Sequence, residues 1–287
     1  MSAASRWGTP VSLIRLEGSD TRRFLHGQSS QAIELAKAGD CLPTCLISPT
    51  ARMRGLALVC IDDAGADLIV IAGNGEAIRA ALDRVLFPAD NVRLGAVQPA
   101  TLWQWQGEAQ TEDSVLLRPG VDLGSGPNGA VVLQRSGEDL PPWLADLPEW
   151  SGEQVETNRL RHGLPAEPSE LNDDTNPFEL GLAHWVSLNK GCYVGQETLA
   201  KLATYDGVKQ QLRYWESSEA FEPGTTLSSA GGERAGVVTS SQGCRGLAVI
   251  RRSQLEASTL EADGSELTIS TPLAFIAPPI GAGGSRT

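Results

Sequence analysis

The segment Asn189-Lys190-Gly191-Cys192-Tyr193-Val194-Gly195-Gln196-Glu197-Thr198 combines a cation, a thiol, an aromatic ring, an amide, a carboxylate and two glycines. Glycine adopts backbone angles that other residues avoid and lets a ligand approach closely. Gly195 is a suitable N-cap, so the following residues predict a short helix over 196–202. Cys192 then lies just before a helix N-terminus and two residues after Lys190, and both neighbours favour the reactive thiolate. We interpret this segment as a functional loop; the alternative is a tight turn around a small buried cysteine.

The run Lys-Gly-Cys-Tyr-x-Gly-Gln-Glu in this segment resembles the signature of the YgfZ family. That family contains folate-binding proteins linked to the maintenance of iron–sulfur clusters. It is a branch of the glycine-cleavage T-protein (aminomethyltransferase) superfamily. Shorter stretches at 18–30 and 159–165 also resemble the family, and the resemblance extends over most of the chain. It implies an α+β, multi-domain T-protein arrangement around a central folate cavity, with a C-terminal antiparallel β-barrel.

Local sequence patterns agree with this fold class. Short strand-like runs after residue 207, separated by Gly, Pro, Ser and Asp, are typical of a small antiparallel barrel. Taken with the resemblance, they predict four parts. These are an N-terminal folate-binding domain (1–48 and 150–204), a central α+β domain (49–149), the barrel (205–277) and a disordered tail (278–287).

Composition restricts the possible functions. The chain has 287 residues and a formal net charge of −12, which opposes broad binding to nucleic-acid backbones. It has no apolar run long enough for a membrane helix and no apolar signal core at its start, so we expect a cytoplasmic protein without membrane contact. An odd number of cysteines, five, predicts a reducing compartment without disulfides. The four outside the loop are expected to be mostly buried and inert: Cys41, Cys45, Cys60 and Cys244.

Several local signals locate helices. Ser19, Asp20 and Thr21 offer caps for a helix whose Phe24 and Leu25 face the core. Asn74 is the expected cap of a second helix over 76–86. Ser151 and Gln154 form a capping-box pattern before a third helix, which Gly163 ends.

Glu179 is the main candidate for a ligand contact outside the loop. It stands among Phe178, Leu180 and Leu182, and a carboxylate in such surroundings must find partners or shift its pKa. A carboxylate can accept two parallel N–H bonds from a pterin. The segment 177–186 resembles the T-protein segment whose Glu holds the folate pterin; the alternative is an edge-strand Glu that points to water.

The remaining candidate site residues follow from these two segments and from the barrel. Cys192 is the candidate functional thiol, with Lys190 beside it. The candidates for contact with tetrahydrofolate or a derivative are Glu179, Trp185, Tyr193, Gln196 and Arg213, and no metal ligands are expected. Trp185 is suited to stack on a pterin ring but is equally suited to a core position.

The absence of one carboxylate bears on whether the protein only binds folate or also catalyses aminomethyl transfer. T-proteins carry an Asp for aminomethyl chemistry in a strand that matches residues 50–56 here, and this stretch holds no carboxylate. Asp62 and Asp63 lie further on and predict a turn before Gly65. We therefore do not expect a turnover aminomethyltransferase.

Three functions remain open. The first is a tetrahydrofolate-binding accessory protein that supports assembly or repair of iron–sulfur proteins, including tRNA-modifying iron–sulfur enzymes. Its partners would be folate and iron–sulfur proteins or their assembly machinery. The second is a folate-dependent one-carbon transferase or demethylase. The third is an interaction module that has kept the fold and lost the ligand.

Overall fold

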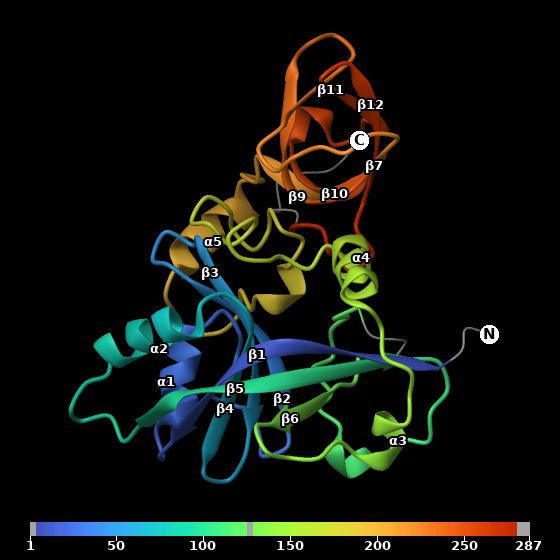
Figure 1. Cartoon of the computed structure of the whole chain (residues 1–287). Coiled ribbons are helices and arrows are strands. Elements are labelled where there is room, and N and C mark those ends of the chain that lie inside the picture. Colours follow the sequence, from blue (N-terminus) through green and yellow to red (C-terminus); the bar gives the residue numbers. More distant parts are fainter. Residues whose placement is uncertain (1–3, 125–128, 280–287) are drawn as a thin grey trace.

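The chain forms one large sheet, a group of helices and turns beside it, and a closed barrel at its C-terminal end (Figure 1). The computed structural model describes residues 4–124 and 129–279. Most of the predicted disordered tail, residues 280–287, lies outside this part, and its first residue, Pro278, is buried. The predicted α+β class with a C-terminal barrel is confirmed.

The large sheet is antiparallel, with strand order β2-β3-β4-β1-β5-β6. The strands are β1 (Ser5–Glu17), β2 (Cys41–Ile47), β3 (Met53–Ile61), β4 (Gly65–Ala72), β5 (Arg93–Gln106) and β6 (Val132–Arg135). β2 pairs with β3 along its length, so one sheet runs across the boundary predicted between residues 48 and 49. β5 is one continuous strand of 14 residues.

Two helices cover one face of this sheet. They are α1 (Thr21–Gln28) and α2 (Gly75–Arg84). Phe24 and Leu25 are buried with Ile14 and Leu16 of β1, as predicted for a helix that faces the core. The Asn74 side chain accepts a 2.9 Å hydrogen bond from the backbone of Ala77, which confirms this helix cap.

The connection between the sheet and the barrel contains short helices and turns. Its helical elements are α3 (Pro142–Ala145), α4 (Gly152–His162), η2 (Ala183–Trp185) and α5 (Gln196–Thr204), whereas η1 (Asp113–Val115) lies between β5 and β6. Both hydrogen bonds of the capping box between Ser151 and Gln154 are present at the start of α4. Gly163 ends α4 with φ 72°, a left-handed conformation that favours glycine.

The barrel closes in the order β10-β7-β12-β11-β8-β9. Its elements are β7 (Gln210–Ser217), β8 (Thr226–Ser228), β9 (Arg234–Gln242), β10 (Arg245–Arg251), η3 (Arg252–Gln254), β11 (Thr259–Ala262) and β12 (Ser265–Ser270). Trp215, Leu227 and Leu267 lie in its core. Residues 273–276, which follow β12, form no strand, and Ile276 makes an isolated bridge with Leu182.

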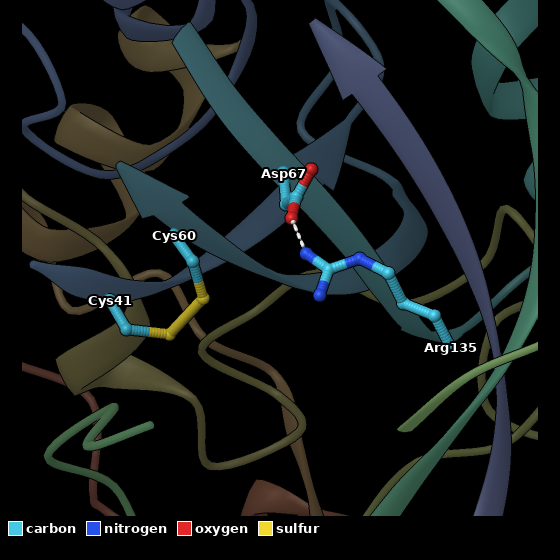
Figure 2. The surroundings of a disulfide bond; sticks show 4 residues. All are labelled: Cys41, Cys60, Asp67 and Arg135. Carbon is cyan, nitrogen blue, oxygen red and sulfur yellow. Dashed lines mark hydrogen bonds and ion pairs between the residues drawn. A yellow bond between two sulfur atoms is a disulfide. The ribbon is translucent and has the colours of Figure 1, made fainter. Parts of the chain in front are cut away.

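Cys41 and Cys60 form a disulfide between β2 and β3 (Figure 2). The two residues are directly opposite each other in the strand register, with Cα atoms 4.0 Å apart. The expectation of five free thiols was therefore wrong, because it rested on an odd cysteine count and not on strand pairing. Cys244 was also expected to be buried, but it is exposed on the turn between β9 and β10.

Candidate functional site

Lys190 is a buried cation that binds the end of α1. Its Nζ atom donates hydrogen bonds to the carbonyl oxygens of His26, of Ser29 at 2.7 Å and of Gln31 at 2.7 Å. The C-terminal carbonyls of a helix carry partial negative charge and lack partners within the helix. Lys190 therefore joins the loop to the C-terminus of α1.

Two opposed effects act on the protonation of the Lys190 side chain. Burial lowers its pKa to about 7. Three carbonyl acceptors and the ring of Tyr193, whose centre is 4.4 Å from Nζ, favour the ammonium form. An ammonium group has three N–H donors for these three carbonyls, whereas a neutral amine has two, so the geometry fits the charged form better.

Cys192 is separate from this cation. Its thiol is exposed and unpaired, and across the described residues no hydrogen bond or ion pair joins Lys190 to it. The predicted role of Lys190 as the neighbour that favours the Cys192 thiolate stays a prediction, and the hydrogen bonds of its ammonium group go to the end of α1. The other predicted feature, a helix directly after Gly195, is confirmed as α5.

Tyr193 and Trp185 are core residues. Trp185 is 1% exposed, and its carbonyl accepts a 2.7 Å hydrogen bond from Ser30. Tyr193 is buried, burial raises the pKa of its phenol to about 12, and its hydroxyl has no hydrogen-bond partner within the described residues. Neither ring is open to stack on a ligand in this structure. Gln196 is half-buried as the first residue of α5.

Glu179 closes a turn. Its Oε2 atom accepts a 3.0 Å hydrogen bond from the backbone of Asn176, and the Asn176 side chain accepts one from the backbone of Glu179 at 3.2 Å. This reciprocal pair is a capping box, with Pro177 at the first position after the cap. The side chain of Gln210 also hydrogen-bonds the carboxylate, and burial raises the pKa of Glu179. The alternative of an edge-strand residue that points to water is wrong, because Glu179 is buried in a turn.

Arg213 lies on barrel strand β7, in contact with the chain segment after the barrel. Its guanidinium lies 5.1 Å from the centre of the Phe275 ring and donates to the carbonyl of Leu212 at 2.9 Å. Leu212 in turn donates its backbone N–H to the carbonyl of Glu179 at 2.8 Å. The backbone of Glu179 is thus bonded to Leu212, the residue before Arg213 on β7, whereas Lys190 and Tyr193 contact each other in the loop.

A mostly apolar cleft of about 210 Å³ lies between the large sheet and α4. Its residues come from β1, β3, β4, β5, the segment between β5 and β6, α4 and the turn after α4. They are Trp7, Thr9, Leu56, Ile71, Ala72, Leu102, Gln104, Leu123, Val155, Glu156, Asn158, Arg159, Leu164 and Pro165. Trp7 stacks on Trp150 with ring centres 4.1 Å apart, so one wall of the cleft is backed by a pair of indoles.

Polar groups gather on the α4 side of the cleft. Arg159 makes a two-point pair with Glu156, at 2.8 and 2.7 Å, and donates to the carbonyl of Leu164 at 2.7 Å. Across from α4, the Gln104 side chain donates to the carbonyl of Leu123 at 2.5 Å. The cleft therefore offers apolar walls and a few fixed polar groups, the combination that is typical of small-molecule sites.

None of the seven residues predicted from the sequence lines this cleft. The signal that pointed to it was the run at 159–165, which resembles the family and supplies Arg159, Leu164 and Pro165. The other lining residues lie on four strands, on α4 and, for Leu123, between β5 and β6, and no local pattern marks them.

The stretch at 50–56, which holds no carboxylate, contributes to the cleft through β3. β3 places Leu56 in the wall. Asp62 forms the predicted turn, since its Oδ1 atom accepts from the backbones of Ala64 and Gly65 at 2.8 Å. Arg15 hydrogen-bonds the same carboxylate and lowers the pKa of Asp62 to about 2.

Comparison with known proteins gives the class of the fold. The chain superposes on the glycine cleavage system aminomethyltransferase T from Bartonella henselae with a TM-score of 0.76, over 98% of this chain and 88% of that one, at 17% identity. The fold is thus that of the aminomethyltransferase T-proteins. Residues 210–275 match the model of the CAF17 C-terminal beta-barrel domain.

Two relatives share detectable sequence. A putative chloroplastic transferase of Arabidopsis thaliana is 30% identical over 258 residues, which are 80% of this chain and 60% of that protein. An aminomethyltransferase of Koribacter versatilis is 36% identical over 86 residues, 29% of this chain and 22% of its own length. This chain therefore spans less than two thirds of either relative. Among the described residues, no helix is long and apolar enough to cross a membrane.

Proposed function

We propose that this protein binds a reduced folate and that the cleft between the sheet and α4 takes the pterin ring. The observation that carries the proposal is the cleft itself, with apolar walls from Leu56, Ile71 and Leu102 and with Gln104 and Arg159 as fixed polar groups. At about 210 Å³ the cleft is smaller than the roughly 300 Å³ at which sites for whole drug-sized ligands begin. It suits a single ring system, with the remainder of the ligand outside.

The side chains that line the cleft fit a protein that binds folate without aminomethyl transfer. Glu156 is the one carboxylate among the described lining residues, and both its oxygens are held by Arg159. A free carboxylate is what stabilisation of a cationic one-carbon intermediate requires. Leu56 on β3 supplies an apolar surface instead.

The proposed biological role is that of an accessory protein for iron–sulfur proteins. It rests on the resemblance of the Lys190–Glu197 segment to the YgfZ family. The exposed Cys192 thiol, on a loop tied to α1 by Lys190, is available to a partner protein. The proposed partners are iron–sulfur enzymes, including those that modify tRNA, or their assembly machinery, in the cytoplasm.

Calorimetric titration of the purified protein with tetrahydrofolate tests the binding proposal. Saturable binding supports it, and absence of binding overturns it. The alternative, a one-carbon transferase, is tested by tetrahydrofolate-dependent release of ammonia from an aminomethyl-lipoyl carrier. Robust turnover would favour the enzyme.

The accessory role is tested in cells that lack the protein. We expect Cys192→Ser to fail to restore iron–sulfur enzyme activity while it still folds and binds folate. Cys244→Ser is the matched control, because Cys244 is the other exposed free thiol of the described chain. Full rescue by Cys192→Ser would indicate that the loop has only a structural role.

A further inference from the structure

Glu170 is a fully buried carboxylate between the cleft and the barrel. It is 0% exposed. Its Oε1 atom accepts hydrogen bonds from Thr239 at 2.5 Å and Ser240 at 2.7 Å, both on strand β9. Its Oε2 atom accepts from the backbone of Ala166 at 3.0 Å. One oxygen thus faces the barrel, and the other faces the chain that follows α4.

Arg159 connects this carboxylate to the wall of the cleft. Its guanidinium lies 3.7 Å from Glu170, and the same side chain lines the cleft. It also donates to the carbonyl of Leu164, another lining residue. The α4 wall and strand β9 are therefore bound to one buried anion from opposite sides.

The hydrogen bonds and the ion pair around Glu170 depend on the negative charge of its carboxylate. A buried carboxylate is stable only when its oxygens are hydrogen-bonded and a cation lies near. Here three donors and one guanidinium meet that need. Buried polar networks of this kind fix one arrangement of the groups that they join.

We propose that Glu170 is a positioning residue that couples the cleft to the barrel, so that a ligand held against Arg159 also restrains strand β9. This inference rests on the proposed function, because it takes the ligand of the cleft to be a folate. It adds that the barrel, which contributes no lining residue to the cleft, takes part in ligand binding. Glu170 acts through Arg159 and does not itself touch the ligand.

Hydrogen exchange of the full chain, with and without tetrahydrofolate, tests the coupling. In the wild type we expect the ligand to slow amide exchange both in α4 and in β9 (234–242), by roughly threefold or more. In Glu170→Gln, tetrahydrofolate should still protect α4, but the protection of β9 should be lost. If Glu170 had only a structural role, Glu170→Gln would raise amide exchange, but the effects of tetrahydrofolate on α4 and on β9 would still change together.

Two further variants complete the test. Ser240→Ala removes one of the two β9 donors to Glu170 and leaves Thr239, so it should reduce the β9 protection, and this can be measured even if Glu170→Gln fails to fold. Ser241→Ala, the next residue on the same strand, is the matched control and should behave as the wild type. Wild-type protein that binds tetrahydrofolate without any change in β9 would overturn the coupling and leave the proposed function intact. Protein that binds no tetrahydrofolate would overturn the proposed function and this inference with it.

Discussion

The Nζ atom of Lys190 lies 4.4 Å from the centre of the Tyr193 ring, three residues further along the same loop. The ring covers one side of the ammonium group, and the carbonyls at the end of α1 accept its hydrogen bonds. The cation of the Lys-Gly-Cys motif therefore holds the loop in place, and the cysteine two residues later remains exposed.

Lys190→Met should lower the free energy of unfolding by about 2–4 kcal/mol, because buried carbonyls lose their donor while a chain of similar length remains. Urea unfolding measures the change. Lys201→Met is the control, since Lys201 is exposed on α5, and it should fall within about 0.5 kcal/mol of the wild type. A loss below about 1 kcal/mol for Lys190→Met would show that these contacts contribute little.

Ala72→Trp should weaken tetrahydrofolate binding at least tenfold, about 1.4 kcal/mol, because an indole at this lining position fills the cleft. Titration calorimetry gives the affinity, and circular dichroism shows whether the variant is folded. Ala81→Trp adds the same side chain at an exposed site on α2 and should bind as the wild type. Normal affinity in a folded Ala72→Trp protein would place the ligand elsewhere.

Glu179→Gln distinguishes between two positions for the pterin, one in the cleft and one at Glu179, the site predicted by resemblance. Gln is also accepted in a capping box, so the turn that begins at Asn176 should persist. Since Glu179 does not line the cleft, placement of the pterin there predicts an affinity within about threefold of the wild type. The role of Glu179 as a pterin anchor stays a prediction. A loss of about one to two decades in the same titration would establish it and move the pterin to Glu179.

Alkylation of the native protein without reductant should label Cys192 and Cys244 and spare the other three cysteines. Cys41 and Cys60 are joined to each other. Cys45 is fully buried, and burial raises the pKa of its thiol, so it should react only after unfolding. Peptide mass spectrometry identifies the labelled sites. Labelling of Cys41 or Cys60 before reduction would contradict the pairing.

Asp62 should contribute to stability at moderate pH and lose that contribution in acid. Its pKa is about 2 in the folded chain, below its ordinary value near 3.8, chiefly because of its hydrogen bonds with Arg15. A carboxyl whose folded pKa is lowered stabilises the fold above its ordinary pKa, and the effect disappears as the pH falls from about 4 to 2. Asp62→Asn should therefore flatten the acid limb of stability against pH in this range. Asp63→Asn is the control at the exposed neighbour, and an unchanged acid limb in Asp62→Asn would refute the assignment.

The sequence predicted the elements whose signals are local. The capping box of Ser151 and Gln154, the cap at Asn74 and the closing Gly163 each involve residues a few positions apart. The barrel was predictable because short strands and turn residues alternate along 208–270.

The remaining features depend on contacts between distant segments. The disulfide requires the register of β2 on β3, which places Cys41 opposite Cys60. The buried position of Trp185 and the bonds of Lys190 to residues 26–31 depend on tertiary packing. The capping box at Asn176 was available as an Asn-Pro-x-Glu pattern, but the apolar neighbours of Glu179 favoured a ligand interpretation.

The stacked pair of Trp7 and Trp150 gives the molecule an optical reporter of its own. The rings lie 4.1 Å apart and only 10° from parallel, close enough for their excited states to interact. Trp7 lines the cleft, whereas Trp150 immediately precedes the cap of α4. Occupancy of the cleft and movement of that helix would both change the emission of this pair. Five further tryptophans also emit, so the contribution of the pair to a ligand-induced change in fluorescence is the part that is lost in both Trp7→Phe and Trp150→Phe.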